Sequence, residues 1–338
     1  MRPSVLAAAL LAISTSAAAC TTTHPSTERV APPSDTGATR LLHIAYLQKQ
    51  ADQQYFLDEA GGARTEAAKL RNVVVTFVDV GNDAATALVA FHAQLAAHVD
   101  AIAIVVPDQQ IGPQIISEAR AAGIPLLASD DRIKDANGVP APFVGFDSAL
   151  MGQKVGEQAG RLFKAAGWTV ADTHIVTAWK QDLSGCTERV DGAHDAFNSA
   201  TGVDLPVLEI ATNNTPIDAE KKARVAIARL KSVRNWIVWG CNDENETGIV
   251  TALQKSGVAP AHIIGVGLGA YMTCKDWQTG VTTGNRAALY INGKDVGASA
   301  VDALVGRIRD GTDLPAQTIA KSVIVDRQSW QSAGVACA

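Results

Sequence analysis

Short apolar runs alternate with helix-like segments from residue 41 onward, and the alternation occurs twice along the chain. The apolar runs of the first series are 41–47, 73–80, 101–106 and 124–128, and those of the second are 174–179, 205–210, 235–240 and 262–267. Segments with helical spacing, such as 84–98 and 109–122, lie between them. Runs this short and continuously apolar predict strands of a parallel sheet that is covered by helices on both faces. We therefore expect two doubly wound (Rossmann-like) α/β domains, each built on a parallel sheet.

The composition fits a globular chain without a basic surface. The chain has 338 residues, of which 47% are hydrophobic and 19% are charged, and this is enough to build two ordinary cores. Its net charge of −5 offers no concentration of positive charge for phosphate groups. We therefore expect no nucleic-acid partner.

The first twenty residues have the organisation of a bacterial export signal. A positive start at Arg2 precedes an apolar run over 5–13, which is too short to span a bilayer. The small residues 17–19 then precede Cys20. We expect residues 1–19 to be a signal peptide and the mature protein to reside in the periplasm.

Cys20 stands where bacterial lipoproteins carry their lipidated cysteine. This resemblance implies that Cys20 becomes a lipidated N-terminus that tethers the protein to a membrane. The leucine that usually lies three residues earlier is Ala17 here, so the alternative is ordinary cleavage next to an incidental cysteine. Residues 21–40 are rich in Thr, Pro and Ser and have no apolar periodicity. We therefore expect 20–40 to form the anchor and a flexible linker.

Four further cysteines lie in the expected mature chain: Cys186, Cys241, Cys274 and Cys337. Export permits disulfides, but four cysteines allow three pairings, and the sequence neither selects one nor excludes free thiols. No C-x-x-C motif or His/Cys spacing predicts a zinc site. We expect neither a metal nor a cofactor.

Motifs for catalysis have little support. No serine lies in a G-x-S-x-G elbow, and Gly265, Gly267 and Gly269 do not have the spacing of a dinucleotide-binding fingerprint. Cys186 and His194 are separated by about two turns of a predicted helix, which is too far for a direct contact. We therefore expect a protein that is not an enzyme and has no catalytic residue.

Polar side chains follow several of the predicted strands, which is where open α/β sheets bind ligands. Lys49 follows the first run, with Tyr55 and Phe56 just after it, and Asp130 and Asp131 follow the fourth. Sugars carry many hydroxyls and an apolar C–H face, so their sites need carboxylates, amides or cations beside an aromatic platform. The alternative interpretation is a solvated loop, with the aromatic rings packed under a helix.

The adjacent pair Asp130 and Asp131 ends a predicted strand. Side chains of consecutive extended residues point in opposite directions, so we expect the two carboxylates to have different roles. One is expected to contact a ligand, while the other is held by Arg132 or Lys49.

Several segments occur in the order and spacing of a known family: LQKQADQQYF, PDQQIG, SDDRIKDANGVP, AAGW, NWIVWGCND and HIIGVG. On these segments, residues 41–330 resemble the bacterial periplasmic sugar-binding proteins of ABC importers, and most closely their L-arabinose-binding members. The resemblance implies a periplasmic binding protein type 1 fold, with a three-crossover hinge between two domains and a ligand cleft between them. The implied domains are 41–146 plus 291–317, and 147–290 plus 318–338.

The resemblance also implies a ligand site. The residues that match the family's pocket, or replace its members, are Lys49, Gln53, Tyr55, Phe56, Asp130, Asp131, Phe146, Leu183, Arg189, Cys241, Asn242, Gly269 and Met272. Gln53 replaces a glutamate of the family, while Gly269 and Met272 replace an asparagine and an aspartate. Tyr55 replaces a tryptophan and Cys241 a methionine. Since these changes remove hydroxyl partners, we expect the sugar selectivity to differ from that of the family.

The implied function is the binding of a monosaccharide and its delivery to an ABC import permease by a monomeric protein. An arabinose-like pentose is the starting expectation, with a deoxy sugar, another pentose or hexose, or a polyol as alternatives. A different function would be a tethered sugar sensor for a receptor kinase or chemoreceptor. An exported carbohydrate-active enzyme is less compatible, because Asp130 and Asp131 share one loop and cannot flank a scissile bond from opposite sides.

Overall fold

The computed structural model describes residues 40–50 and 52–337. The expected signal peptide, Cys20 and the expected linker as far as residue 39 lie outside the described residues. Within the described part, no helix is both long enough and apolar enough to cross a membrane.

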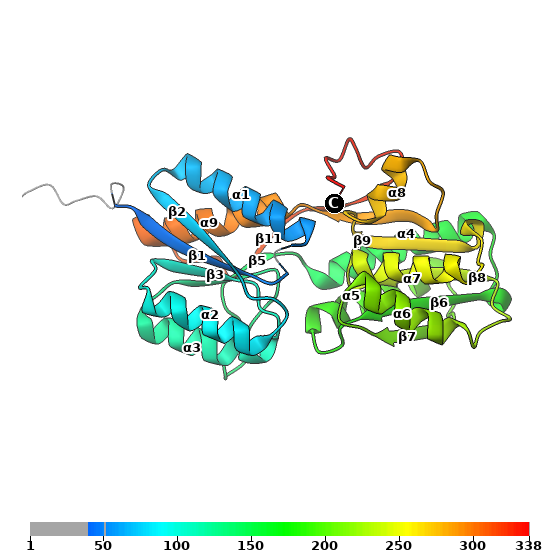
Figure 1. Cartoon of the computed structure of the whole chain (residues 1–338), viewed down its shortest axis with the longest axis horizontal. Coiled ribbons are helices and arrows are strands. Elements are labelled where there is room, and N and C mark those ends of the chain that lie inside the picture. Colours follow the sequence, from blue (N-terminus) through cyan, green and yellow to red (C-terminus); the bar gives the residue numbers. More distant parts are fainter. Residues whose placement is uncertain (1–39, 51, 338) are drawn as a thin grey trace, which may run out of the picture. The chain divides into compact units, whose positions relative to one another are not determined.

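The first lobe is a six-stranded parallel sheet with the strand order β11-β5-β4-β3-β1-β2 (Figure 1). Its strands are β1 (Leu42–Gln48), β2 (Val73–Asp79), β3 (Ala101–Ile104), β4 (Leu126–Ser129), β5 (Phe143–Gly145) and β11 (Thr318–Ile319). Its helices are α1 (Gln54–Leu70), α2 (Ala84–Ala96), η1 (Gln109–Ile111), α3 (Gly112–Ala122) and α9 (Gly293–Asp310). Helices α1 and α9 cover one face of the sheet, and α2 and α3 cover the other.

The second lobe has the same architecture, with the strand order β12-β10-β9-β8-β6-β7. Its strands are β6 (Thr173–Trp179), β7 (Val207–Ala211), β8 (Asn235–Gly240), β9 (Ile263–Gly269), β10 (Asn285–Ile291) and β12 (Ser322–Asp326). Its helices are α4 (Ser148–Ala166), η2 (Val170–Asp172), α5 (Ser184–Thr201), α6 (Pro216–Ile227), α7 (Asp243–Lys255), η3 (Pro260–His262) and α8 (Thr273–Thr279). Helices α4 and α5 pack on one face, and α6 and α7 pack on the other.

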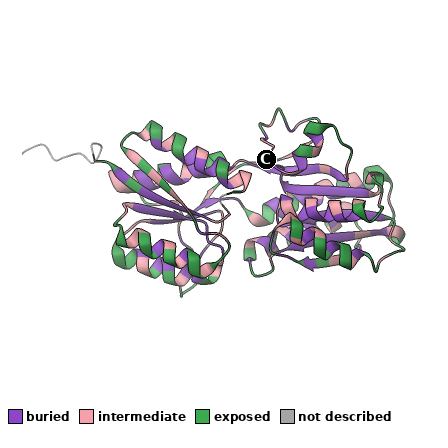
Figure 2. Ribbon diagram, viewed as in Figure 1, coloured by how far each residue is buried: buried purple, intermediate pink, exposed green. Residues whose placement is uncertain are grey.

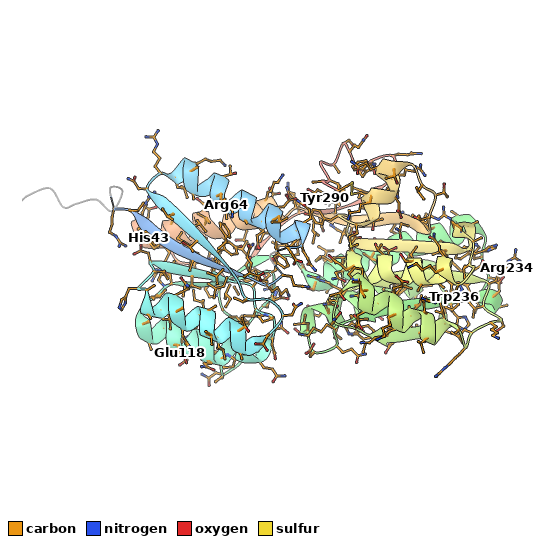
Figure 3. All side chains as sticks on the ribbon, in the orientation of Figure 1. His43, Arg64, Glu118, Arg234, Trp236 and Tyr290 are labelled. Atoms are coloured by element: carbon orange, nitrogen blue, oxygen red, sulfur yellow. A yellow bond between two sulfur atoms is a disulfide. The ribbon has the colours of Figure 1, made fainter. Side chains whose placement is uncertain are left out.

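Burial of both sheet faces explains the unbroken apolar runs. Ile44 and Tyr46 of β1 pack in the core under α1 and α9, while Ala45 and Leu47 pack in the core under α2 and α3. Strands β3, β4, β8 and β9 are buried along their whole length, whereas the edge strands β2 and β7 expose part of theirs (Figure 2). In the second lobe, Trp236 of β8 is only 2% exposed (Figure 3). The central strands are therefore apolar at most positions, with buried polar residues only at strand ends such as Ser129 and Asn235.

The predicted fold of two parallel-sheet α/β lobes is confirmed, and the eight predicted apolar runs form β1 to β4 and β6 to β9. The last strand, β12, departs from the expectation of parallel sheets, because it runs antiparallel to β10 at the edge of the second sheet. The chain passes between the lobes after β5, after β10 and after β11. Since residues 318–319 pair with β5, the third crossover follows residue 319 and not residue 317.

The four cysteines of the described chain form two disulfides. Cys186 bonds to Cys241, with a Cα–Cα distance of 4.8 Å, and Cys274 bonds to Cys337, with a Cα–Cα distance of 5.6 Å. The first joins α5 to the loop between β8 and α7. The second joins α8 to the C-terminal segment of the chain.

Candidate functional site

A cavity lies at the carboxyl ends of the central strands, between the two lobes. Its lining includes every residue predicted from the sequence: Lys49, Gln53, Tyr55, Phe56, Asp130, Asp131, Phe146, Leu183, Arg189, Cys241, Asn242, Gly269 and Met272. The structure therefore brings the whole predicted set together. Residues that were not predicted also line it, among them Cys186, Asn214, Glu244, Tyr271 and Ile291.

Asp131 is held by a cation of the same lobe. The Lys49 ammonium forms an ion pair with the Asp131 carboxylate, and the two side chains are only 13% and 11% exposed. Arg132 is directed elsewhere, because its guanidinium lies 4.0 Å from the ring centre of Phe143 and hydrogen-bonds to Gln317. The Lys49–Asp131 pair thus places compensated charge in the wall of the cavity.

Asp130 keeps one carboxylate oxygen without an N–H or O–H donor. Its Oδ1 accepts a hydrogen bond of 2.5 Å from the Tyr55 hydroxyl, whereas its Oδ2 is buried and accepts no N–H or O–H donor among the described residues. The residue has φ +58°, the left-handed conformation, which Asp adopts more readily than most residues. The Asp130 side chain also hydrogen-bonds to Glu59, which requires a proton on one of the two carboxyls, so Oδ2 is a candidate for a ligand hydroxyl in competition with that shared proton.

Behind Asp130 lies a buried carboxyl that was not predicted from the sequence. Glu59 of α1 is fully buried and accepts hydrogen bonds from the Tyr46 hydroxyl (2.6 Å), the Ser129 hydroxyl (2.6 Å) and the Gln48 amide (2.5 Å). These bonds join α1 to the ends of β1 and β4 and so fix the backbone that presents Asp130. The sequence feature that could have indicated Glu59 is an acidic residue on the apolar face of α1, three positions after Phe56.

Burial shifts the proton equilibria of this acidic cluster. Desolvation raises the pKa of Glu59, although the hydrogen bonds from Ser129 and Tyr46 oppose that shift. Desolvation also raises the pKa of Asp130 well above its usual value, and the nearby Glu59 charge adds to this effect. A ligand hydroxyl that donates to Asp130 would favour its charged form.

Arg189 provides the complementary donor from the second lobe. Its Nη1 donates a hydrogen bond of 3.1 Å to the Cys241 carbonyl, while its buried Nε has no partner among the described residues. The guanidinium is therefore held at Nη1, and its Nε keeps an unused donor. Together with Asp130, it gives the cavity both a free acceptor and a free donor.

Asn242 has structural partners of its own. It is the N-cap of α7, where its Oδ1 accepts from the backbone N–H of Asn245 at 3.1 Å, and its Nδ2 donates to the Asn214 carbonyl at 3.0 Å. The neighbouring Asp243 accepts hydrogen bonds from the backbone N–H groups of Met272 and Thr273. Both residues therefore fix the loops that border the cavity, whatever contact Asn242 makes with a ligand.

The second lobe supplies an apolar patch beside its polar lining residues. This patch is lined by Leu183, Leu268, Met272 and the disulfide-bonded Cys186 and Cys241. The first lobe instead contributes aromatic rings, with Tyr55 6.3 Å from Phe146 between ring centres. The cavity thus combines a polar end with apolar and aromatic surfaces.

Glu244, in the first turn of α7, is a further carboxyl that lines the cavity. Burial raises its pKa to about 7, and the charge of Asp243 adds to that shift. Nothing in the sequence DENE distinguishes it from an exposed helix N-terminus, which is why it was missed.

We expect the E244Q variant to lose less stability than the wild type as the pH rises. The raised pKa means that the folded state retains a proton that the unfolded state releases, so stability falls between pH about 4.5 and about 7. Melting temperatures measured from pH 5 to pH 8 should diverge, with E244Q the more stable at pH 8. The exposed Glu188 of α5 provides the control E188Q. Parallel melting curves for E244Q and the wild type would contradict the assignment.

Comparisons with known proteins agree with this geometry. Residues 44–312 match a family described as a periplasmic binding protein domain. The chain is 28% identical over 313 residues to an ABC transporter L-arabinose-binding periplasmic protein of Azospirillum brasilense, an alignment that covers 90% of this chain and 92% of the relative. It is 25% identical over 247 residues to the L-arabinose-binding periplasmic protein of Escherichia coli (strain K12), covering 72% and 74%.

Solved structures share the fold at lower identity. A periplasmic solute-binding protein of an ABC transporter from Actinobacillus succinogenes 130z with bound D-allose superposes with a TM-score of 0.73 at 20% identity, covering 86% of this chain and 99% of that one. A solute-binding protein from Burkholderia graminis C4D1M in complex with D-arabinose gives 0.74 at 17% identity, covering 87% and 98%. At this identity the likeness concerns the fold.

Proposed function

The chain belongs to the periplasmic binding protein family, and we propose that it binds a monosaccharide in the interlobe cavity and delivers it to an ABC import permease. The observation that carries the proposal is the pair of buried polar atoms with unused hydrogen-bonding capacity in one cavity, Asp130 Oδ2 and Arg189 Nε. One comes from each lobe. A ligand that satisfies both must bridge the lobes.

The chemistry of the cavity favours an uncharged polyhydroxyl ligand. The charges of Lys49 and Asp131 compensate each other, and Asp130 and Arg189 offer one acceptor and one donor to ligand hydroxyls. The ring of Tyr55 and its aromatic neighbours provide a surface for the C–H face of a sugar. Such a site also discriminates by desolvation, because a ligand without matching hydroxyls leaves the buried groups unpaired.

The ligand class follows from the two unlike sides of the cavity. The polar first-lobe side suits the hydroxyls of an arabinose-like pentose, and the named relatives bind L-arabinose by their descriptions. The apolar patch of the second lobe, with Leu183 and Met272, suits a carbon that carries no hydroxyl. We therefore propose an arabinose-like pentose or a related sugar, with deoxy sugars as the first variants to test.

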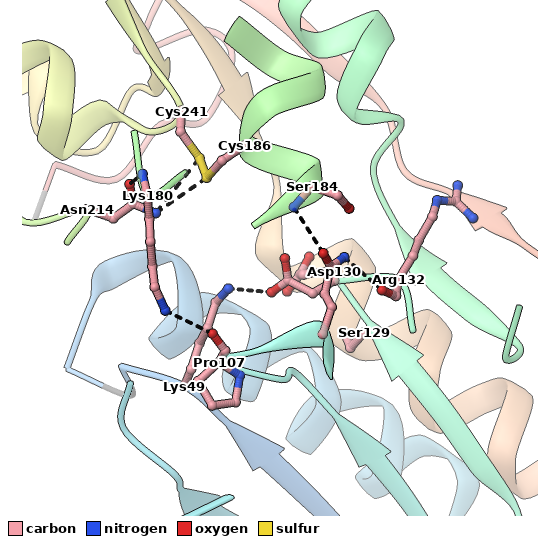
Figure 4. A network of polar contacts seen from close by, with 12 residues as sticks. Lys49, Pro107, Ser129, Asp130, Arg132, Lys180, Ser184, Cys186, Asn214 and Cys241 are labelled. Atoms are coloured by element: carbon pink, nitrogen blue, oxygen red, sulfur yellow. Dashed lines mark hydrogen bonds and ion pairs between the residues drawn. A yellow bond between two sulfur atoms is a disulfide. The ribbon is translucent and has the colours of Figure 1, made fainter. Parts of the chain in front are cut away.

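Binding is proposed to act through hinge closure. Two hydrogen bonds already link the lobes beside the cavity, from Lys180 Nζ to the Pro107 carbonyl (3.2 Å) and from the Ser184 backbone N–H to Gln109 Oε1 (3.0 Å) (Figure 4). A ligand bonded to both lobes adds to these contacts only when the lobes are closed. It thereby favours the closed form, which the permease would recognise.

The cellular setting is part of the same proposal. The mature protein is a monomer in the periplasm that is tethered through a lipid on Cys20 and performs no covalent chemistry on its ligand. This part rests on the family and on the N-terminal sequence pattern.

A thermal-shift screen tests the proposed ligand class. The chain without the expected signal peptide and anchor cysteine, residues 21–338, is melted with L-arabinose, D-galactose, D-xylose, D-ribose, L-fucose, L-rhamnose or myo-inositol, and with amino acids and purine nucleosides as controls. We expect one sugar to raise the melting temperature, because a ligand at about 100 times its Kd stabilises the native state by about 2.7 kcal/mol. A shift produced only by an amino acid or a purine would refute the assignment, as would product formation from glycosides.

A further inference from the structure

The Cys186–Cys241 disulfide forms part of the cavity wall. Both cysteines line the cavity and are only 5% and 2% exposed. The bond packs in a small apolar cluster with Trp179, Leu183 and Val190. The disulfide therefore lies where a bound ligand would touch it, next to Leu183 on the apolar side.

The same bond connects the two elements that present polar groups of the second lobe. Arg189 follows Cys186 by one turn of α5, and its Nη1 donates to the Cys241 carbonyl at 3.1 Å. Asn242 follows Cys241 directly and caps α7. The Asn214 Nδ2 lies 3.4 Å from the Cys186 sulfur and 3.9 Å from the Cys241 sulfur (Figure 4).

Arginine is a long side chain that loses considerable rotamer freedom when it is fixed. The Arg189–Cys241 hydrogen bond spans the same two segments as the disulfide, so its length depends on the separation that the disulfide sets. The buried Arg189 Nε has no partner among the described residues. Opening the disulfide would free α5 and the β8–α7 loop to move apart at this point.

We propose that the Cys186–Cys241 disulfide is a positioning element of the ligand site, which orients Arg189 and contributes an apolar contact surface for the sugar. The inference rests on the proposed sugar-binding function. Its consequence is that affinity depends on this covalent bond and not only on the stability of the fold.

The second disulfide provides a matched control. Cys274 and Cys337 join α8 to the C-terminal segment, and neither residue lines the cavity. Each of the double variants C186S/C241S and C274S/C337S removes a different disulfide, and both disulfides lie in the second lobe. Both are expected to lower the melting temperature of the ligand-free protein, since each cross-link restricts the unfolded chain.

Sugar affinity should separate the two variants. Calorimetric titration of the 21–338 chain with the sugar identified by the screen should give at least about a tenfold weaker Kd for C186S/C241S, equivalent to about 1.4 kcal/mol. C274S/C337S should remain within about twofold of the wild type. If C186S/C241S does not fold, C186A/C241M replaces it as the test variant, because its methionine fills the space of the sulfurs with an apolar side chain. We expect the same loss of affinity for C186A/C241M.

A double-mutant cycle with R189A tests the positioning role itself. If the disulfide orients Arg189, R189A should weaken binding at least about fivefold less in the C186A/C241M background than in the wild type, because the two changes remove one shared interaction. Additive effects, or an unchanged Kd for the variants without Cys186–Cys241, would overturn the inference while leaving sugar binding intact. Failure of the wild type to bind any sugar would overturn the proposed function together with this inference.

Discussion

The D130A variant is expected to bind the sugar about 30-fold or more weakly while remaining folded. Its Oδ2 is a buried oxygen that accepts no N–H or O–H donor among the described residues, and removing one member of a buried charged hydrogen bond costs about 2–5 kcal/mol in a complex. Burial raises the pKa of the Asp130 carboxyl, so its charge does not stabilise the free protein, and D130A should lose mainly the hydrogen bond from Tyr55. Calorimetric titration and ligand-free melting, measured on the same samples, separate affinity from stability.

The backbone at this position calls for a second variant. Asp130 has φ +58°, a conformation in which alanine is strained by about 1–2 kcal/mol but glycine is not. D130G deletes the same carboxyl without that strain. If the carboxyl binds the ligand, D130A and D130G should lose affinity to a similar extent and differ mainly in melting temperature. Wild-type affinity in D130G would show that Asp130 acts only through its backbone.

The sequence left open which cation pairs with the supporting carboxylate of the adjacent residues Asp130 and Asp131. Alternation along a strand predicted different roles, and it offered Arg132 or Lys49 as the partner of the supporting carboxylate. The structure pairs Asp131 with Lys49 and turns Arg132 to Phe143. Alternation along a strand does not apply here as stated, because β4 ends at Ser129 and Asp130 has a left-handed backbone, so the ligand role of Asp130 stays a prediction. The choice of Lys49 as partner depends on how β1 and β4 lie relative to each other across the sheet.

Buried central strands could be predicted from the local sequence, whereas a very short edge strand could not. Strands β8 and β9 are buried over their entire length, and this requirement is visible as an unbroken apolar run. Strand β11 consists of two residues, Thr318 and Ile319, and exists because β5 offers a free edge. No propensity or period is measurable over so short a segment, so its lobe could be assigned only from the assembled sheet.

Some residues of the candidate site could be predicted from the sequence, and others could not. Residues at strand ends, such as Lys49 and Asp130, could be predicted from sheet geometry and from the family resemblance. The disulfide partners Cys186 and Cys241 are 55 residues apart, and their pairing depends on the packing of α5 against the β8–α7 loop. Glu59 was missed because an acidic side chain on a helix is usually solvated. Here three hydrogen bonds allow it to be buried.

Gly297 and Gly306 lie on the same helix, α9, and their alanine variants are expected to have opposite effects on stability. A Cβ added at Gly297 would lie 1.9 Å from the Glu59 carbonyl oxygen and 3.0 Å from the Ala63 backbone nitrogen. These are backbone atoms of α1, so the helices must separate. Overpacking of this kind costs about 1–3 kcal/mol, more than the helix propensity gained from alanine.

At Gly306 no atom lies within 4 Å of the added Cβ, so G306A should gain about 0.5–1 kcal/mol from the lower entropy of alanine in a helix. Urea unfolding of G297A and G306A beside the wild type measures both signs. Because α1 also carries Glu59, whose hydrogen bond to Ser129 supports the end of β4, G297A should weaken sugar binding as well as the fold. Equal stabilities of G297A and G306A would mean that α1 and α9 do not depend on this close backbone approach.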